Sequence, residues 1–357
     1  MRVVIAGGGT GGHVIPALAI ARELQARYQA ETLFVGTSRG IETRLVPQAG
    51  FGLMLIKVGA LKNVSLVTRL RTLIDLPLAI LHSRKIIRIF DPDVVIGVGG
   101  YASGPAMAAA ILARIPTLAF EANYVPGFAN KIVGRWVSAA AVHFEQTTQY
   151  FRNPRVVGVP VRPEFFDVPA SDANQPPTLL VFGGSQGAHA INQAVIATVP
   201  KVLRQIPNLK VIHQTGERDY NDVQAAYMRA EASAEVSAFI DKMPQAFGRA
   251  GLVICRSGAS TVAEIAAAGK PAIFIPFPRA TDDHQRRNAE AIANAGAAVL
   301  MTESELSPEN LAQAVIELFA DPAQLRAMSE KAKALGHPDA AAQVAEMIAE
   351  LAARRTK

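Results

Sequence analysis

The feature that most constrains the fold is a strand, glycine-run and helix pattern that opens both halves of the chain. The apolar run Val3–Ala6 leads into Gly7-Gly8-Gly9-Thr10-Gly11-Gly12-His13, and Leu179–Phe182 leads into Gly183-Gly184-Ser185-Gln186-Gly187-Ala188. An amphipathic pattern of helical period follows each glycine run, and strands then alternate with helices. The sequence therefore predicts an α/β chain of two Rossmann-like domains facing across a cleft, with ligands bound at the carboxyl ends of the strands.

Six short strands are predicted in each half. In the first half they are Val3–Ala6, Thr32–Val35, Leu53–Lys57, Val94–Val98, Thr117–Phe120 and Val137–Val142. In the second half they are Leu179–Phe182, Lys210–His213, Val236–Ala238, Leu252–Cys255, Ala272–Ile275 and Ala298–Met301. A chain of 357 residues, half of them hydrophobic, is long enough to bury one core in each half.

A proline-rich tract separates the two halves. Five of the 22 prolines fall within residues 160–177. Because proline fixes φ and lacks an amide hydrogen, this tract is predicted to be a stiff connector between domains. We expect domains at 1–163 and 164–339, and a last helix at about 340–357 that is able to pack back on the first domain.

Composition and apolar pattern argue against several classes of protein. The single cysteine, Cys255, excludes a disulfide scaffold and a multi-cysteine zinc site, and its apolar strand predicts a buried thiol. The N-terminal residues lack the apolar stretch of a signal peptide, and no run of about 18 apolar residues occurs. We expect a cytoplasmic protein that is soluble or peripheral to a membrane.

The net positive charge is confined to the first half. Residues 1–163 carry 18 lysines and arginines against 8 acidic residues, whereas the rest of the chain carries 18 against 22. A basic surface throughout would have pointed to nucleic acid. A basic surface on one domain indicates instead an anionic partner for that domain, such as a membrane, and no nucleic acid.

The basic signal is strongest in residues 62–88. One acid, Asp75, stands there among basic side chains and many leucines and isoleucines; the basic residues are Lys62, Arg69, Arg71, Arg84, Lys85 and Arg88. One interpretation is a helix or helical hairpin in a membrane interface, with cations on anionic head groups. The alternative is a solvated basic face over an ordinary core.

The glycine runs are candidate anion sites, because backbone amides at a helix N-terminus bind phosphate and glycine allows a close approach. Gly7, Gly9 and Gly12 spell G-x-G-x-x-G. A dinucleotide site also needs an acid after the second strand, and that strand ends in Val35-Gly36-Thr37. The Walker pattern is absent as well, which argues against NTP hydrolysis. Each run alone is also consistent with a tight turn that binds nothing.

Polar residues follow three strands of the first half. His13 begins a helix, where the helix dipole favours a neutral imidazole that can act as a general base. Its alternative is a capping or packing role. Tyr101 and Ser103 lie in the glycine-rich turn 99–105, and Glu121 and Asn123 follow the next strand. Glu121 is either a site carboxylate or a solvated loop acid.

Two polar clusters lie in the second half. In the run 256–264, Ser257 or Ser260 is a candidate helix cap, and Glu264 is either a dipole-complementing acid or a carboxylate that accepts two ribose hydroxyls. The run 282–288 begins another helix, and its amide side chains are either sugar-reading groups or a solvated helix start.

No metal site is predicted. Asp91-Pro92-Asp93 spells the D-x-D of metal-dependent sugar transferases, but it precedes a strand and therefore lies at the wrong end of the sheet. Asp282-Asp283 is at the correct end and lacks further ligands. We expect a turn at the first motif, and neither metal nor cofactor.

Taken together, the motifs resemble the MurG family of bacterial N-acetylglucosaminyltransferases, which have the GT-B fold. The resemblance runs over nearly the whole chain and rests on residues 8–13, 99–105, 183–188, Phe239-Ile240-Asp241-Lys242-Met243 and 255–264. It implies inverting transfer of GlcNAc from UDP-GlcNAc to the C4 hydroxyl of undecaprenyl-pyrophosphoryl-MurNAc-pentapeptide, at the cytoplasmic face of the inner membrane. The first domain would then face acceptor and membrane, and the second would bind the donor.

The resemblance also implies roles for individual residues. His13 would be the general base, with Glu121 as a supporting or rival one. Donor-binding residues would be Thr10, Gly11, Gly12, Asn123, Arg162, Ser185, Ile240, Glu264 and Gln285. Supporting residues of the donor loops would be Gly184, Gln186, Ala259, Ser260, Thr261 and His284, with the choice between His284 and Gln285 as the sugar-reading group left open. Tyr101 and Ser103 would contact the acceptor.

Two classes of alternative remain. One is another UDP-sugar enzyme of the same fold, such as a UDP-GlcNAc 2-epimerase or a glycosyltransferase with a soluble acceptor. The other is a membrane-surface protein that binds UDP-sugar without turnover. The basic and apolar stretch 62–88 favours a membrane-bound acceptor. The sequence does not indicate an oligomeric state.

Overall fold

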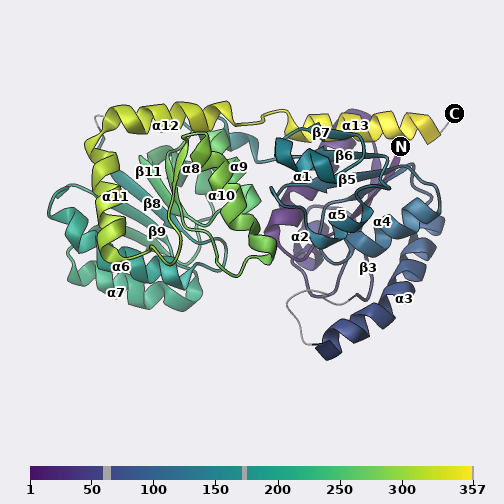
Figure 1. The fold of residues 1–357 in the computed structure, drawn as a ribbon, viewed down its shortest axis with the longest axis horizontal. Helices are drawn as coiled ribbons and strands as arrows, with labels where there is room; N and C mark the ends of the chain where they lie inside the picture. The colour runs from purple at the N-terminus through teal and green to yellow at the C-terminus, as the bar shows by residue number, and fades with distance from the viewer. Residues whose placement is uncertain (59–65, 171–174, 356–357) are drawn as a thin grey trace. The chain divides into compact units, whose positions relative to one another are not determined.

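The computed structural model describes residues 1–58, 66–170 and 175–355, without the side chains of 66–74. The chain divides into two compact units. Unit 1 comprises Met1–Val161 and His337–Lys357, and unit 2 comprises Arg162–Gly336 (Figure 1). The chain therefore leaves unit 1 once and returns to it with its last helix.

Unit 1 contains a parallel sheet in the order β3-β2-β1-β4-β5-β6-β7. Its strands are β1 Arg2–Ala6, β2 Glu31–Gly36, β3 Gly52–Leu55, β4 Val94–Gly97, β5 Thr117–Glu121, β6 Ala139–Val142 and β7 Pro154–Val156. Its helices are α1 Gly11–Tyr28, α2 Glu42–Gln48, α3 Leu66–Phe90, α4 Ser103–Leu112, α5 Phe128–Val133, the 3-10 helix Glu145–Tyr150 and α13 Ala340–Arg355. Helix α13 packs on α1.

Unit 2 repeats this plan in a parallel sheet of order β10-β9-β8-β11-β12-β13. Its strands are β8 Thr178–Phe182, β9 Lys210–Gln214, β10 Ser233–Ser237, β11 Leu252–Cys255, β12 Ala272–Phe274 and β13 Ala298–Leu300. Its α-helices are α6 His189–Leu203, α7 Tyr220–Arg229, α8 Met243–Arg249, α9 Ala259–Ala268, α10 His284–Asn294, α11 Pro308–Ala320 and α12 Pro322–Ala334. Its 3-10 helices are Pro163–Phe165, Glu217–Asp219 and Thr281–Asp283.

Both strand orders place the topological switch point beside the strand that carries the glycine run. In each unit the first strand lies between the second and the fourth, so β1 meets β4 and β8 meets β11. Loops that leave the carboxyl ends of these strands diverge there and form the usual binding position of an open parallel sheet. The predicted α/β class with two Rossmann-like domains is confirmed.

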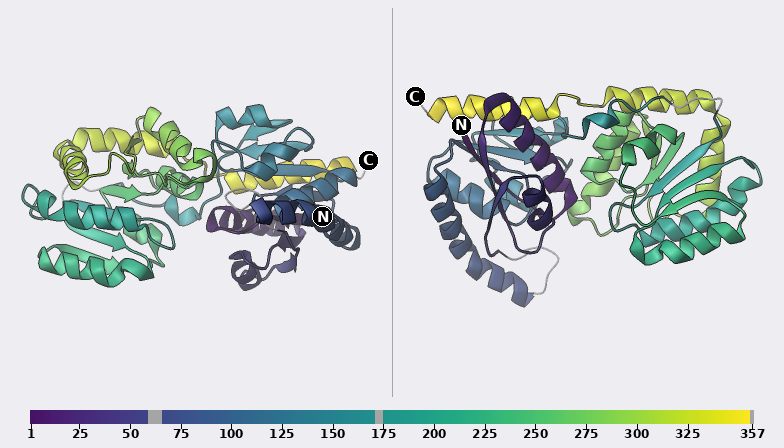
Figure 2. Two further views of the ribbon diagram at one scale, coloured as in Figure 1. Left: turned by 60° about the horizontal axis from the view of Figure 1, so that its bottom comes forward. Right: turned by 180° about the vertical axis from the view of Figure 1, so that it is seen from behind.

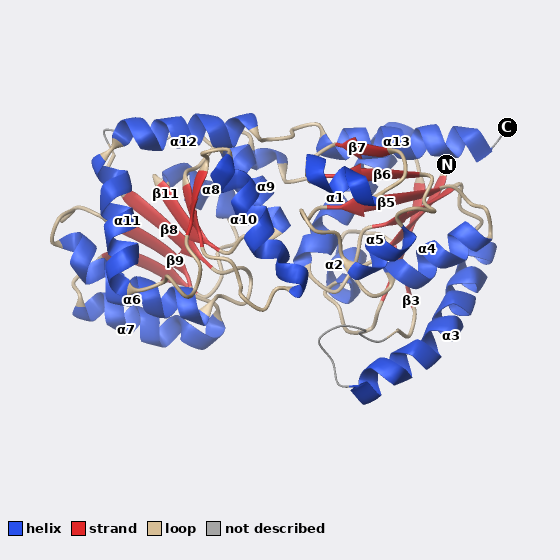
Figure 3. Ribbon diagram, in the orientation of Figure 1, coloured by secondary structure: helices blue, strands red, loops and turns tan. Residues whose placement is uncertain are grey.

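The central strands are apolar without alternation because helices cover both faces of each sheet (Figures 2 and 3). Val3, Val4 and Ile5 of β1 are fully buried, as are Leu252, Val253 and the other residues of β11. Cys255 is among them, and burial raises the pKa of its thiol well above the usual value. The expectation of a buried core thiol is therefore confirmed.

The twelve predicted strands are present, with ends shifted by a few residues, but the prediction missed β7. This strand of three residues begins at Pro154 and occupies the sheet edge beside β6. Proline cannot donate to a ladder, so such a strand forms only at an edge, and its sequence carries no alternating signal.

The prediction of a stiff connector across residues 160–177 was wrong for most of its described part. Phe165 is fully buried in unit 2 and lies edge-on to Phe247, with ring centroids 5.2 Å apart. The Nζ atom of Lys270 donates a hydrogen bond of 3.0 Å to the carbonyl of Pro169. The apolar side chains between the prolines therefore anchor this segment to unit 2, whose first residue is Arg162.

Candidate functional site

In unit 1 the loops that follow β1 and β4 are in backbone contact. The amide of Gly8 donates to the carbonyl of Gly99 over 3.2 Å. Gly100 has a φ of +82°, and a Cβ atom there would lie 2.3 Å from the carbonyl oxygen of Gly8. Only glycine fits that position, and the two loops are thereby fixed to each other.

Sequence reasoning missed a buried acid beneath the first glycine run. Glu42 is 1% exposed, and its Oε2 accepts from the amide of Gly9 over 2.7 Å. Its Oε1 accepts from the amide of Thr37 over 2.9 Å and from its hydroxyl over 3.1 Å. The carboxylate thus joins the loops after β1 and β2, and the signal available was an acid shortly after the second strand.

This contact corrects the prediction of an anion site at the first glycine run. The amides of Gly7, Gly8 and Gly9 donate to Val35, Gly99 and Glu42 respectively. An amide already bound to a carbonyl or carboxylate is not available to a phosphate. The part of this run that remains for a ligand is the start of α1, at Thr10, Gly11 and Gly12.

His13 lies in the first turn of α1 with its ring against the β4 loop. Its Nδ1 is 3.0 Å from the carbonyl oxygen of Gly8. Because a carbonyl only accepts, Nδ1 donates this hydrogen bond, and Nε2 is the ring nitrogen left for another partner. A Cβ atom at Gly99 would lie 2.8 Å from that Nε2, so glycine at this position makes room for the ring.

Glu121 ends β5 as a buried, fully bonded carboxylate. Its Oε1 accepts from the amide and the side chain of Asn123, over 3.0 and 3.1 Å. Its Oε2 accepts from the amide of Gly127 over 2.9 Å and from Asn130 over 3.0 Å. Four donors fix the loop between β5 and α5, and this geometry favours an anchoring role over the expected role of a base.

The two expected acceptor residues differ in exposure. The side chain of Tyr101 is on the surface, with 53% of the residue exposed. Ser103 is fully buried, and a Cβ at Gly97 of β4 would lie 2.6 Å from its Oγ. A hydroxyl inside the core cannot contact the acceptor substrate, so the expected role of Ser103 in binding that substrate is corrected.

In unit 2 the second glycine run crosses the loop after β9. A Cβ on Gly187, at φ +73°, would overlap the carbonyl of Thr215, and the amide of Gly187 donates to the carbonyl of Gly184 over 2.9 Å. The tight turn leaves Ser185 and Gln186 exposed at its tip. Helix α6 begins directly after this run, so its N-terminus faces the same edge of the sheet.

The loop after β11 leads into α9, and Glu264 lies on the second turn of that helix. Burial raises the pKa of this carboxyl from 4.5 to about 7, although the positive charge of Arg162 acts to lower it. Helix α9 has Gly258 as its N-cap, without a capping side chain. Ser257 donates instead to the carbonyl of Gln285 over 2.8 Å, and the Oγ of Ser260 is buried with no partner among the described residues. The predicted serine caps are therefore wrong.

The loop after β12 fixes Gln285 and His284 differently. The Oε1 of Gln285 accepts a hydrogen bond from the amide of Phe277 over 2.9 Å, so the oxygen end of its side-chain amide is held. The Nδ1 of His284 is 2.6 Å from the carbonyl oxygen of Thr281 and is therefore the protonated nitrogen. Each side chain thus has one polar end held and one left for a ligand.

Sequence reasoning also missed Arg256, which supports this loop. Its Nη1 donates to the carbonyls of Ile275 and Pro276 over 3.1 and 3.0 Å. The guanidinium also forms an ion pair with Glu303 and lies 5.4 Å from the ring centroid of Phe277. The signal available in the sequence was an arginine directly after the apolar strand Leu252–Cys255.

The D-x-D motif lies in a turn at the amino end of β4, as predicted. Asp91 has a φ of +45° and pairs with Arg355 of α13 over 2.7 Å, and Asp93 accepts from the amide of Arg2 over 2.8 Å. Both carboxylates are thus used within unit 1. Among the described residues no group of three histidine, cysteine or acidic side chains is placed to hold a metal ion.

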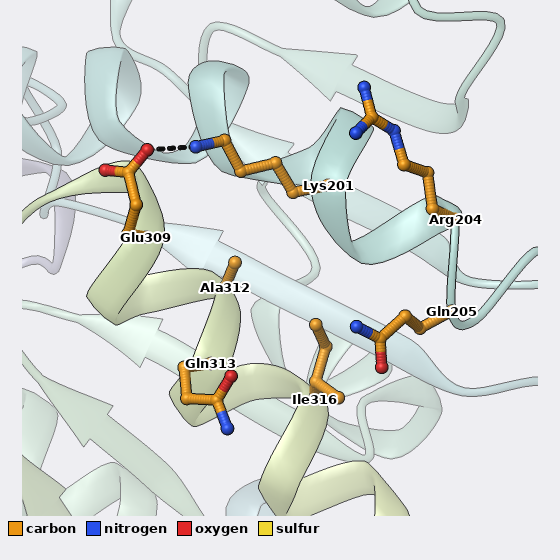
Figure 4. Close-up of a pocket in the computed structure, with 7 residues that line it drawn as sticks. All are labelled: Lys201, Arg204, Gln205, Glu309, Ala312, Gln313 and Ile316. Atoms are coloured by element: carbon orange, nitrogen blue, oxygen red, sulfur yellow. Dashed lines mark hydrogen bonds and ion pairs between the residues drawn. The ribbon is translucent and has the colours of Figure 1, made fainter.

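A shallow pocket of about 380 Å³ lies elsewhere on unit 2, between α6 and α11 (Figure 4). Lys201 forms an ion pair with Glu309 beside it, and Arg204 and Gln313 contribute to its wall. These residues stand on helix faces rather than in the loops at the carboxyl ends of the strands. The pocket is therefore separate from the predicted donor loops.

Only part of the basic stretch 62–88 can be placed. Lys62 and the side chains of Arg69 and Arg71 lie outside the described residues. In the remainder of α3, Leu78 and Leu81 are 65% and 58% exposed, and Ile86 and Ile87 are buried. Arg84, Lys85 and Arg88 are exposed. No helix in the described part of the chain has the length and hydrophobicity needed to cross a bilayer.

Comparison with known proteins agrees with the division of the chain into two α/β units. The family model of the glycosyltransferase family 28 N-terminal domain matches residues 3–142, and that of the C-terminal domain matches residues 178–344. The chain is 45% identical to the UDP-N-acetylglucosamine--N-acetylmuramyl-(pentapeptide) pyrophosphoryl-undecaprenol N-acetylglucosamine transferase of Myxococcus xanthus, over 98% of this chain and 93% of that protein.

Two solved structures place the fold. The crystal structure of Acinetobacter baumannii MurG is 33% identical, with a TM-score of 0.82 over 98% of this chain and 99% of the other. The UDP-GlcNAc 2-epimerase of Neisseria meningitidis, bound to UDP-GlcNAc, has a TM-score of 0.68 over 98% and 100% of the two chains at 12% identity, which shows a shared fold alone. The chain therefore belongs to glycosyltransferase family 28 and has its two-domain GT-B fold.

Proposed function

We propose that this chain transfers GlcNAc from UDP-GlcNAc to the C4 hydroxyl of MurNAc in undecaprenyl-pyrophosphoryl-MurNAc-pentapeptide, with inversion and release of UDP. The observation that carries the proposal is the identity of 45% across nearly the full length to a relative named for that transfer. The product is the lipid-linked disaccharide of peptidoglycan synthesis, which places the chain in cell wall biogenesis and hence in cell shape and division.

Unit 2 is the proposed donor domain. Ser185, with Gly184 and Gln186, would meet the diphosphate at the start of α6, where amide dipoles favour an anion. Glu264 would accept the ribose hydroxyls, supported by Ala259, Ser260 and Thr261 of the same helix. The amide of Ile240 already donates to a protein side chain, so its carbonyl is the group left for a uracil N–H.

The sugar end of the donor would meet the loop after β12. The amide nitrogen of Gln285 is the better candidate for reading GlcNAc hydroxyls, because its oxygen is held by Phe277. His284 remains a second candidate through Nε2. Arg162 is exposed and contributes positive charge beside Glu264.

Unit 1 would supply the base and the acceptor contacts. The C4 hydroxyl gives its proton to Nε2 of His13 as its oxygen attacks the anomeric carbon, and the bond to UDP breaks. His13 is preferred to Glu121, because both oxygens of Glu121 are occupied. Thr10, Gly11, Gly12 and Asn123 would complete the donor contacts, and Tyr101 would contact the acceptor.

Negative charge develops on the departing diphosphate and needs fixed positive charge or dipoles. We assign this task to the N-terminus of α6 and to Arg162, without a metal or another cofactor. The D-x-D carboxylates stand at the opposite end of β4 from the glycine loops, and they are bonded within unit 1.

The proposed location is the cytoplasmic face of the inner membrane, as a peripheral protein. The exposed leucines of α3 beside Arg84, Lys85 and Arg88 suit an interface with anionic lipid. An acceptor carried on undecaprenyl stays in the bilayer, so the enzyme must come to it. The exposed leucines and cations of α3 therefore support a membrane-bound acceptor substrate over a soluble one.

The test is transfer of labelled GlcNAc to the lipid-linked muramoyl-pentapeptide, with and without EDTA. We expect product at the same rate in both, and a rate lowered by at least about a hundredfold in His13→Ala with little change in UDP binding. UDP-GlcNAc binding with no product would support a binding protein, and formation of ManNAc would support an epimerase. A rate abolished by EDTA would refute the metal-free step.

A further inference from the structure

Gln214 connects the two loops that would hold opposite ends of the donor. It is the last residue of β9 and only 1% exposed. Its Nε2 donates to the carbonyl of Gly184 over 2.9 Å, and its Oε1 accepts from the amide of Ile240 over 2.9 Å. One buried side chain thus joins the loop after β8 to the loop after β10.

The sheet register explains why this position reaches both loops. Gln214 lies opposite Phe182 of β8 on one side and Ser237 of β10 on the other. Phe182 is followed at once by Gly183, and Ser237 lies three residues before Ile240. The side chain therefore spans the same two neighbours as its own backbone, and it bonds Gly184 and Ile240, which lie two and three residues beyond the ends of those strands.

The chemistry of the two partners requires an amide. A carbonyl at Gly184 needs a donor and an N–H at Ile240 needs an acceptor, so both the residue type and the amide orientation are fixed. Glutamate accepts at Ile240 but cannot donate to Gly184 when ionised. Methionine has a similar length, no donor and only a weak acceptor in its sulfur. The two substitutions therefore separate loss of one bond from loss of both.

We infer that Gln214 is a positioning residue for the nucleoside diphosphate, which holds the uracil loop and the diphosphate loop at the spacing that one UDP molecule spans. The inference rests on the proposed function and deepens it. A ligand that contacts both loops then binds to a preformed pair, whereas a ligand that contacts one loop gains nothing from the bridge. The side chain touches no reacting atom, so its effect should fall on donor binding.

The experiment compares the affinities of UDP and uridine by calorimetry in wild type, Gln214→Met and Gln214→Glu. Gln205→Met, at an exposed glutamine after α6, is the matched control. We expect Gln214→Met to weaken UDP by about tenfold and uridine by no more than about threefold. Gln214→Glu should weaken UDP further, because it adds a negative charge beneath the diphosphate loop. The control should match wild type for both ligands.

Steady-state kinetics supply a readout that general destabilisation would not give. In Gln214→Met the KM for UDP-GlcNAc should rise by about tenfold, with kcat within about twofold of wild type. Equal weakening of UDP and uridine, or no weakening of either, would overturn the inference. If neither variant folds, amide exchange in the wild type decides: Ile240 should be protected without ligand, and rapid exchange there would refute the bridge.

The outcomes also separate this inference from the proposed function. Wild-type protein that bound neither UDP nor uridine would refute the donor site and the bridge together. Wild-type binding of UDP with no selective loss in Gln214→Met would refute the bridge alone and leave the donor site standing.

Discussion

Replacing Glu264 by glutamine should make the ligand-free protein more stable and its donor affinity weaker. Burial raises the pKa of this carboxyl from 4.5 to about 7, against the charge of Arg162. Below pH 4.5 the carboxyl is protonated in both the folded and the unfolded chain, so it does not lower the free energy of unfolding. As the pH rises towards 7 the unfolded chain ionises first, so the folded state loses stability relative to it.

The size of the effect follows from the displacement of the pKa. Ionisation of Glu264 lowers the free energy of unfolding by about 3 kcal/mol once the pH exceeds 7. The glutamine variant lacks this penalty and should gain stability over wild type by up to that amount at pH 8. Retention of a carboxylate in a place that disfavours it is expected where the charge serves binding.

Donor affinity should change in the opposite direction. Ribose hydroxyls donate best to the ionised carboxylate, whose population rises about tenfold between pH 6 and pH 8 for a pKa near 7. The dissociation constant of UDP-GlcNAc should therefore fall by about tenfold over that range in wild type. In Glu264→Gln it should be larger at pH 8 and nearly independent of pH.

The assay is calorimetric titration of UDP-GlcNAc without acceptor, together with urea unfolding, from pH 5.5 to 8.5. Both phosphates of this ligand are esterified and do not titrate in that range, so the protein supplies the pH dependence. Glu330→Gln, at an exposed acid of α12, is the control. Equal pH dependence of affinity in wild type and Glu264→Gln, or a variant that binds as tightly as wild type at pH 8, would refute the reasoning.

Three further predictions concern unit 1. Burial, together with the charge of His337, lowers the pKa of His143 from 6.5 to about 3. Because the unfolded chain takes up a proton at this position first, the folded protein loses stability as the pH falls below 6.5. His143→Phe should therefore recover about 2 kcal/mol of the free energy of unfolding at pH 5, measured by urea unfolding. Gly99→Ala should lower kcat by at least about tenfold, measured by transfer assay, because its Cβ would displace the ring of His13 and φ is +93°. Leu78→Ser with Leu81→Ser should reduce sedimentation with anionic vesicles by about tenfold or more and leave UDP affinity unchanged.

The vesicle experiment uses these two leucines because the structure changes the choice of residues. The sequence of the stretch 62–88 also offers the apolar residues Leu73, Ile74 and Ile80 as targets. Ile80 packs against the core of unit 1, and the other two side chains are outside the described part of α3. Serine at Ile80 would destabilise the unit, and a loss of vesicle binding would then have two explanations.

The fold was predictable because strands that are buried on both faces of a sheet are apolar at every position, and this pattern is visible in the sequence. A strand such as Leu252–Cys255 is apolar at every position, and each glycine run marks the turn from strand to helix. The positions of His13, Glu121 and Glu264 after strands were predictable for the same reason.

What each of these side chains bonds to was not predictable. The four donors around Glu121 include the amide of Gly127 and the side chain of Asn130, six and nine residues along the chain. Glu42 lies 33 residues along the chain from Gly9, and it accepts a hydrogen bond from the amide of Gly9. Such contacts depend on side-chain direction after the loops have packed, and strand and helix periodicity carries no information about them.

The two glycine runs have the same local pattern and different chemical consequences, and Glu42 accounts for the difference. In unit 1 its carboxylate accepts a hydrogen bond from the amide of Gly9, so that amide is not available to a phosphate, and the neighbouring carbonyl of Gly8 contacts the ring of His13. In unit 2 the tip of the run, at Ser185 and Gln186, is exposed at the N-terminus of α6. Under the proposed roles, Glu42 commits the first loop to positioning the base, and the exposed tip of the second loop is left to receive the diphosphate. Glu42→Ala should accordingly damage transfer through His13 while the affinity for UDP stays within about twofold of wild type, and a large loss of UDP affinity would refute this division of roles.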